Sequence, residues 1–140
     1  MGEKINEFCN ELRDDLTAAD DRLQDLKGQV ENANRETREA IQAKLNQAKA
    51  DLDEQKRKAE DRQQRIKSYL DDKVAETQHD INDWKTKREI KKLERRAERR
   101  ESYASDTVLV AMVAIDEANF AVLEALEARL DAEDAQGASA

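Results

Sequence analysis

The sequence predicts an all-α protein: an elongated antiparallel helical bundle or coiled coil of two or three long helices that forms oligomers. Charged residues make up 41% of the 140 residues, proline is absent and glycine occurs only three times. The abundant Ala, Glu, Lys, Arg, Gln and Leu residues are good helix formers, so this charge-rich composition indicates long helices rather than disorder. Apolar residues also recur every three or four positions through most of the chain, as they do along one face of a helix.

The positions of the apolar stripes and of the candidate breaks divide the chain. We expect one elongated helical domain over residues 1–134, with helices at about 3–27, 34–101 and 105–133. Residues 135–140, with the sequence AQGASA, are expected to form a flexible tail.

The first predicted helix has a regular apolar stripe. Its members are Ile5, Phe8, Leu12, Leu16, Ala19, Leu23 and Leu26. Gly28 follows, where a helix commonly ends with a glycine at positive φ, and Asn34 is a suitable N-cap for the next helix. Because Val30 and Ile41 continue the stripe, both a turn at residues 28–34 and a continuous helix remain open.

The second predicted helix has no proline or glycine to interrupt it between residues 34 and 101. Ala59 is the only apolar residue between Asp53 and Arg65, so the stripe almost disappears there. This pattern is typical of a solvated helix stabilised by charge pairs at i,i+4 spacing. A projecting tip or hinge is the alternative interpretation.

Residues 102–107, with the sequence SYASDT, predict a turn between two helices. Ser105 or Asp106 has the side chain needed to cap the amide groups at the start of the last helix. A short connection favours antiparallel neighbours, so we expect residues 108–130 to fold back on residues 80–100. Such a hairpin would set the basic residues near 85–101 against the acidic C-terminal segment.

The last helix is the most apolar part of the chain, and the other two stripes are narrow. We therefore expect a second copy of the chain to cover it, in a dimer or a higher homo-oligomer, with another protein as a possible further partner. The predicted interaction residues are Val108, Met112, Ile115, Phe120, Leu123 and Leu126 of this helix, together with Trp84, Arg88 and Arg95.

The basic block is the one candidate for a nucleic-acid surface. It consists of Lys85, Lys87, Arg88, Lys91, Lys92, Arg95, Arg96, Arg99 and Arg100. Four glutamates interleave with these residues and the formal net charge of the chain is −8, so nucleic-acid binding is disfavoured. The alternative is that these side chains flank an apolar stripe and pair with acidic neighbours.

The residues that could carry chemistry are isolated. Glu76 and His79 match the Glu-x-x-His pattern of di-iron bundles, but that chemistry needs two such motifs and the chain has one histidine. Cys9 is the only cysteine and is expected to be a small buried apolar residue. We therefore predict no catalytic residue, no metal and no cofactor, and we do not expect an enzyme.

These patterns favour a structural or adaptor protein that acts through helix–helix self-association and protein binding. The alternative is an exchangeable amphipathic-helix binder of lipid or membrane surfaces, which the acidic last helix disfavours. A metal-dependent oxidase built on Glu76 and His79 is a third hypothesis. The N-terminus lacks a signal-peptide pattern, so we expect a cytoplasmic protein.

Overall fold

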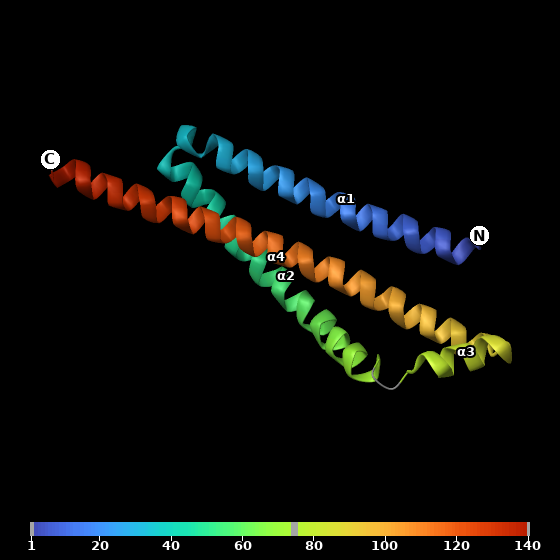
Figure 1. Ribbon diagram of the computed structural model, residues 1–140. Coiled ribbons are helices and arrows are strands. Elements are labelled where there is room, and N and C mark those ends of the chain that lie inside the picture. Colours follow the sequence, from blue (N-terminus) through green and yellow to red (C-terminus); the bar gives the residue numbers. More distant parts are fainter. Residues whose placement is uncertain (1, 74–75, 140) are drawn as a thin grey trace. The chain divides into compact units, whose positions relative to one another are not determined.

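The computed structural model describes residues 2–73 and 76–139, and the regular secondary structure in this part of the chain is entirely helical (Figure 1). The elements are α1 (Glu3–Asn32), the short 3-10 helix η1 (Ala33–Arg35), α2 (Arg38–Lys73), α3 (Gln78–Thr86) and α4 (Ile90–Ser139). The prediction of an all-α fold with antiparallel packing is confirmed, whereas an oligomeric state remains a prediction.

The chain forms two compact units. Unit 1 comprises Met1–Asp15 and Lys58–Val110, and unit 2 comprises Leu16–Arg57 and Ala111–Ala140. Because α1, α2 and α4 each extend through a boundary between these segments, every long helix contributes to both units. The single domain expected over residues 1–134 stays a prediction.

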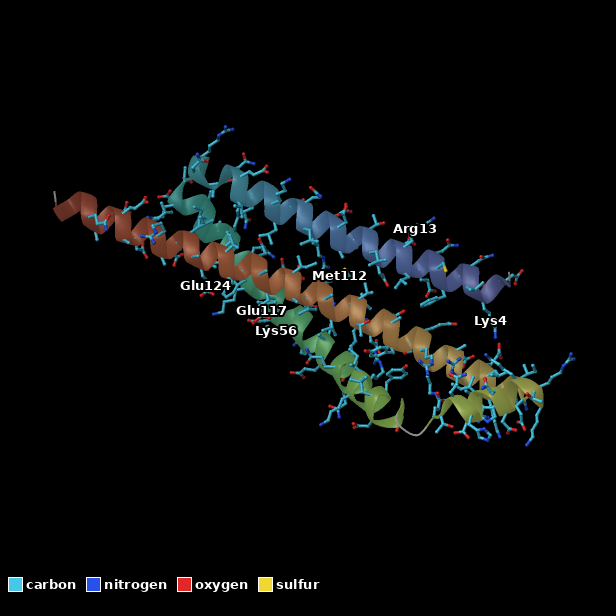
Figure 2. The ribbon with its side chains drawn as sticks, viewed as in Figure 1. Lys4, Arg13, Lys56, Met112, Glu117 and Glu124 are labelled. Carbon is cyan, nitrogen blue, oxygen red and sulfur yellow. The ribbon has the colours of Figure 1, made fainter. Side chains whose placement is uncertain are left out.

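In unit 2, α4 has a helix of its own chain on each of two sides. Glu117 pairs with Lys56 of α2 at 3.3 Å (Figure 2), and the preceding Asp116 pairs with Arg22 of α1 at 2.9 Å. Arg38 near the start of α2 pairs with Asp131 near the end of α4, so these two helices run antiparallel. The buried core of this unit consists of Ile41, Leu52, Met112 and Leu123.

In unit 1, α2 and α4 again meet, and a polar side chain takes part in the buried interior. Tyr69 of α2 stacks on Tyr103 of α4 with ring centroids 4.3 Å apart. The buried residues of this unit are Ala59, Ile81 and Asp106. Since Ala59 is buried, residues 58–65 pack as part of a helix, and the projecting tip that was an alternative for residues 53–65 is wrong.

The first break lies later in the chain than predicted. α1 continues through Gly28 to Asn32, and no described glycine has positive φ. The Asn32 side chain donates a hydrogen bond to the Gly28 carbonyl at 2.9 Å, which stabilises the last turn of α1. The N-cap of α2 is not Asn34 but Thr37, whose hydroxyl accepts from the Ala40 amide at 3.1 Å.

The helix predicted over residues 34–101 is interrupted, and the sequence contains a signal for the start of a new helix there. Thr77 and Asp80 form a capping box at the start of α3, in which each side chain accepts a hydrogen bond from the other residue's backbone amide. This Thr-x-x-Asp spacing is a recognised signal for a helix start, although neither Gly nor Pro marks the end of the preceding helix.

The connection between α3 and α4 is a helix-ending motif built around an arginine. The amide of Glu89 donates to the Trp84 carbonyl at 2.9 Å, and the amide of Arg88 donates to the Lys85 carbonyl at 3.3 Å. This pair of bonds defines a Schellman motif, whose left-handed position usually holds glycine. Here that position is Arg88, with φ of 52°.

The turn predicted at residues 102–107 is wrong, because α4 runs through this segment without interruption. The candidate cap Asp106 is buried and binds arginine side chains rather than backbone amides. The Thr107 hydroxyl donates to the Ala104 carbonyl within the helix, at 2.8 Å. The predicted hairpin therefore does not form, and the helix continues to Ser139, into the expected tail.

None of the helices in the described part of the chain combines the length and the apolarity that crossing a membrane would require.

Burial and the ion pair with Arg22 have opposite effects on the pKa of Asp116. Removal from water raises the pKa of Asp116 above its ordinary value, and the charge of Asp51 raises this pKa further. The ion pair with Arg22 lowers it, but by less. Folded Asp116 therefore binds a proton more readily than unfolded Asp116 does.

The first expected outcome concerns Arg88. Arg88→Gly should raise the free energy of unfolding by about 0.5–1 kcal/mol, because a left-handed conformation costs a non-glycine residue more than the added freedom of unfolded glycine. Ala97→Gly, on the exposed side of α4, is the control and should lower it by about 1 kcal/mol. Urea unfolding followed by circular dichroism measures both. Equal destabilisation by the two changes would contradict the left-handed conformation of Arg88.

The second concerns the pH dependence of stability at Asp116. Because the pKa of this group is higher in the folded protein, its contribution to stability should rise as the pH falls through the folded pKa towards 3.8. The difference in unfolding free energy between the wild type and Asp116→Asn should then move in favour of the wild type over this window. An ordinary ion-pair carboxylate would give the opposite trend.

Candidate functional site

The most buried charged side chain among the described residues is Asp106, in the middle of α4. Arg65 of α2 donates two hydrogen bonds to it, from Nε at 3.0 Å and from Nη2 at 2.8 Å. Arg62, one turn earlier, donates from Nη1 at 3.5 Å. The bonds and the charge of Asp106 raise the pKa of Arg65 above its ordinary value. Both oxygens of the carboxylate are thus satisfied, as a buried charge requires.

In a second cluster, three arginines surround one glutamate, and we call these four residues the arginine cluster. Glu76, just before α3, is largely buried and lies against Arg96, Arg99 and Arg100 of α4. The spacing of three and four residues places these arginines on one face of α4. Arg99 donates a hydrogen bond to Glu76. The Arg100 and Arg96 nitrogens stay 3.7 and 4.0 Å from the carboxylate, which is beyond hydrogen-bond distance.

A cavity of about 510 Å³ lies within unit 1, beside these two clusters. α2 and α4 supply most of its walls, and the stacked pair Tyr69 and Tyr103 lies among them. The lining residues are Asp61, Gln64, Arg65, Ser68, Tyr69, Asp72, Glu76, Arg96, Arg99, Arg100, Ser102, Tyr103 and Asp106. This volume falls within the range of roughly 300–1,000 Å³ found for small-molecule pockets.

Two further members of the basic block pair with acidic residues close to them in the sequence. Lys87 pairs with Asp83 at 3.3 Å and Lys92 pairs with Glu89 at 3.6 Å. Lys92 also approaches the Trp84 ring at 6.0 Å. These pairs agree with the interpretation that the basic side chains have acidic neighbours, although the acids lie near α3 rather than in the C-terminal segment.

The interaction residues predicted on the last helix are buried or half-buried. Met112 and Leu123 are buried in the core of unit 2. Val108, Ile115, Phe120 and Leu126 are half-buried, as is Trp84. Arg88 and Arg95 are exposed. None of these residues lines the cavity. Because α1 and α2 already contact α4, a second copy is not needed to cover the last helix at those contacts.

The exposed apolar side chains lie elsewhere, mainly on α1. Leu16, Leu23 and Val30 recur every seven residues and are 52%, 48% and 53% exposed, while no residue of α1 is fully buried. Cys9, seven residues before Leu16, is also exposed, so its predicted burial is wrong. We call Cys9, Leu16, Leu23 and Val30 the α1 seam.

The isolated chemical groups remain apart. His79 is exposed on α3, whereas Glu76 is occupied by the arginine cluster. Within the described residues no group of three or more His, Cys, Asp or Glu side chains is placed to hold a metal ion. The sequence pattern does not reveal the arginine cluster, because Glu76 lies about 20 residues before Arg96, Arg99 and Arg100 and only the fold brings them together.

A third expected outcome concerns Asp106. Asp106→Asn should lower the free energy of unfolding by about 1–2 kcal/mol, the smaller part of the range for charged hydrogen bonds, because Arg62 and Arg65 are 36% and 52% exposed and can return to water. Glu124→Gln, at an exposed position on the same helix, should change it by less than about 0.5 kcal/mol. Combining Asp106→Asn with Arg65→Gln should cost less than the sum of the two changes. Strict additivity would contradict the pairing.

Comparison with known proteins gives no match to this chain among family models, curated proteins or solved structures.

Proposed function

We propose that this protein is a non-enzymatic structural or adaptor protein that acts through helix–helix association, with a second copy of itself and with another protein. The observation that supports it is the α1 seam. Large apolar side chains at seven-residue spacing are the pattern with which one helix packs against another in a coiled coil. Here they are about half exposed, although their neighbours Leu12, Ala19 and Leu26 are partly covered.

Charge along α1 favours an antiparallel partner copy. Arg13, Asp20 and Lys27 follow the seam residues by four positions, on the side away from Leu12 and Leu26. A parallel pairing in register would place each of these charges beside its own copy. An antiparallel pairing centred on Leu16 would instead bring Arg13 near Asp20 of the other chain.

The expected association is weak. In the antiparallel pairing centred on Leu16, Leu16 faces its own copy and Leu23 faces Cys9, so the large apolar side chains that become covered are Leu16 and Leu23 of each copy. Burying the exposed half of a leucine contributes about 1 kcal/mol, so these four side chains contribute roughly 4 kcal/mol before the cost of association. Before that cost is subtracted, this amount corresponds to a dissociation constant of about 1 mM, so the charge pairs and the partly covered neighbours of the seam must also contribute for dimers to form below that concentration. Self-association should therefore depend strongly on protein concentration.

Analytical ultracentrifugation from about 10 μM to 1 mM tests the proposal. The wild type should form dimers as the concentration rises, and the double variant Leu16→Glu/Leu23→Glu should stay monomeric. Leu70→Glu is the matched control, because Leu70 is 47% exposed on α2 and lies off the seam. Circular dichroism checks that each variant remains helical. A monomeric wild type at every concentration, or equal loss of dimer in the control, would count against the seam.

The lipid-surface hypothesis draws on the same exposed side chains, since an amphipathic helix binds membranes through such a stripe. The many acidic residues of α1 oppose binding to anionic lipid. Flotation with neutral and with anionic liposomes separates the two functions. The lipid-surface hypothesis would be favoured if the wild type floats with either kind of liposome and the variant Leu16→Glu/Leu23→Glu does not.

A further inference from the structure

The arginine cluster of unit 1 has more positive charge and more donors than its one carboxylate uses. Arg96, Arg99 and Arg100 bring three positive charges to Glu76, which supplies one negative charge. Only Arg99 forms a hydrogen bond with it. The Nε atoms of Arg96 and Arg100 are buried, and no acceptor among the described residues lies within hydrogen-bond distance of them. Buried donors are nearly always paired in folded proteins, so this surplus needs an acceptor.

The position of the surplus relative to the cavity indicates what kind of acceptor fits. All three arginines and Glu76 line the 510 Å³ cavity, together with Ser68 and Ser102, whose hydroxyl groups can donate further hydrogen bonds. Planar guanidinium groups match the oxygen atoms of phosphate, and a dianion would balance the two positive charges that Glu76 leaves. The small volume suits a small molecule rather than a macromolecule.

The acidic residues at the cavity other than Glu76 oppose a bound anion only weakly. Asp106 is neutralised by Arg65 and Arg62, so it adds little repulsion. Asp61 and Asp72 are exposed, where solvent and salt weaken their effect. The anion therefore fits at the end of the cavity where α4 presents its three arginines, and Glu76 already occupies that end.

We propose that Arg96, Arg99 and Arg100 bind the phosphate group of a small phosphate compound in this cavity, in competition with Glu76. The glutamate acts as an internal substitute for the ligand: it holds the guanidinium groups together in the free protein and must yield its bond with Arg99 when phosphate binds. This site is separate from the α1 seam and does not depend on self-association.

The competition predicts that removing the charge of Glu76 strengthens binding. Isothermal titration of the full chain with inorganic phosphate and with phenyl phosphate, at constant ionic strength and pH 8, should give about tenfold tighter binding to Glu76→Gln than to wild type, the effect of one charge-assisted hydrogen bond. Adding Arg99→Gln should abolish the gain. Arg95→Gln, which removes an exposed charge from the same helix outside the cavity, should leave it intact.

The two ligands distinguish the source of the phosphate group. Tighter binding of phenyl phosphate would assign the cavity to an organic ester, and equal binding would assign the site to free phosphate. Equal weakening by Arg95→Gln and Arg99→Gln would show attraction by overall charge and overturn the proposal. So would an affinity of Glu76→Gln no higher than that of wild type.

A measurement on the wild type keeps the test independent of how the variants fold. Nitrogen-15 NMR resolves the Nε–H groups of arginine, and saturating phosphate should shift the signals of Arg96 and Arg100 while that of Arg95 stays in place. Signals of Arg96 and Arg100 that do not respond to phosphate, at the same ionic strength as a chloride control, would overturn the proposal.

Discussion

The ion pairing of Asp106 is the interaction on which the organisation of unit 1 depends. An aspartate in the middle of a helix, flanked by Ser105 and Thr107, would ordinarily favour a helix start. Here the carboxylate is directed to Arg62 and Arg65 of α2, and the backbone around it keeps its helical hydrogen bonds. α4 is therefore a single helix of 50 residues that takes part in both units.

The carboxylates of Asp106 and Glu76, both in unit 1, differ in how they are paired. Asp106 has donors to both of its oxygens from α2, whereas Glu76 is shared among three arginines of which only one reaches hydrogen-bond distance. The first arrangement joins α2 to α4 and leaves neither oxygen of the carboxylate without a hydrogen bond. The second leaves positive charge and buried donors next to a cavity, and this surplus is the basis of the proposed phosphate site.

The exposed apolar surface lies on a different helix from the one that hydropathy selects. Residues 108–126 contain the strongest apolar pattern, and their own chain covers part of it: Met112 and Leu123 are buried. Acidic residues of the same segment pair with Arg22 of α1 and Lys56 of α2. α1 has a more regular but weaker stripe, and only part of it is covered. The most apolar segment of this chain thus supplies part of its core, whereas the partly covered heptad stripe of α1 is the surface through which we propose association.

The sequence by itself determined the all-α fold, because helix-forming residues, the absence of proline and the three-to-four-residue spacing all act locally. It also contained the start of α3, in the spacing of Thr77 and Asp80. Tertiary contacts decided the rest. Only the arginines of α2 show why Asp106 lies inside a helix, and only the packing around α1 shows which half of its stripe stays exposed. The meeting of Glu76 with residues 96–100 likewise depends on the left-handed turn at Arg88, a conformation that glycine usually supplies and that local propensity does not assign to arginine.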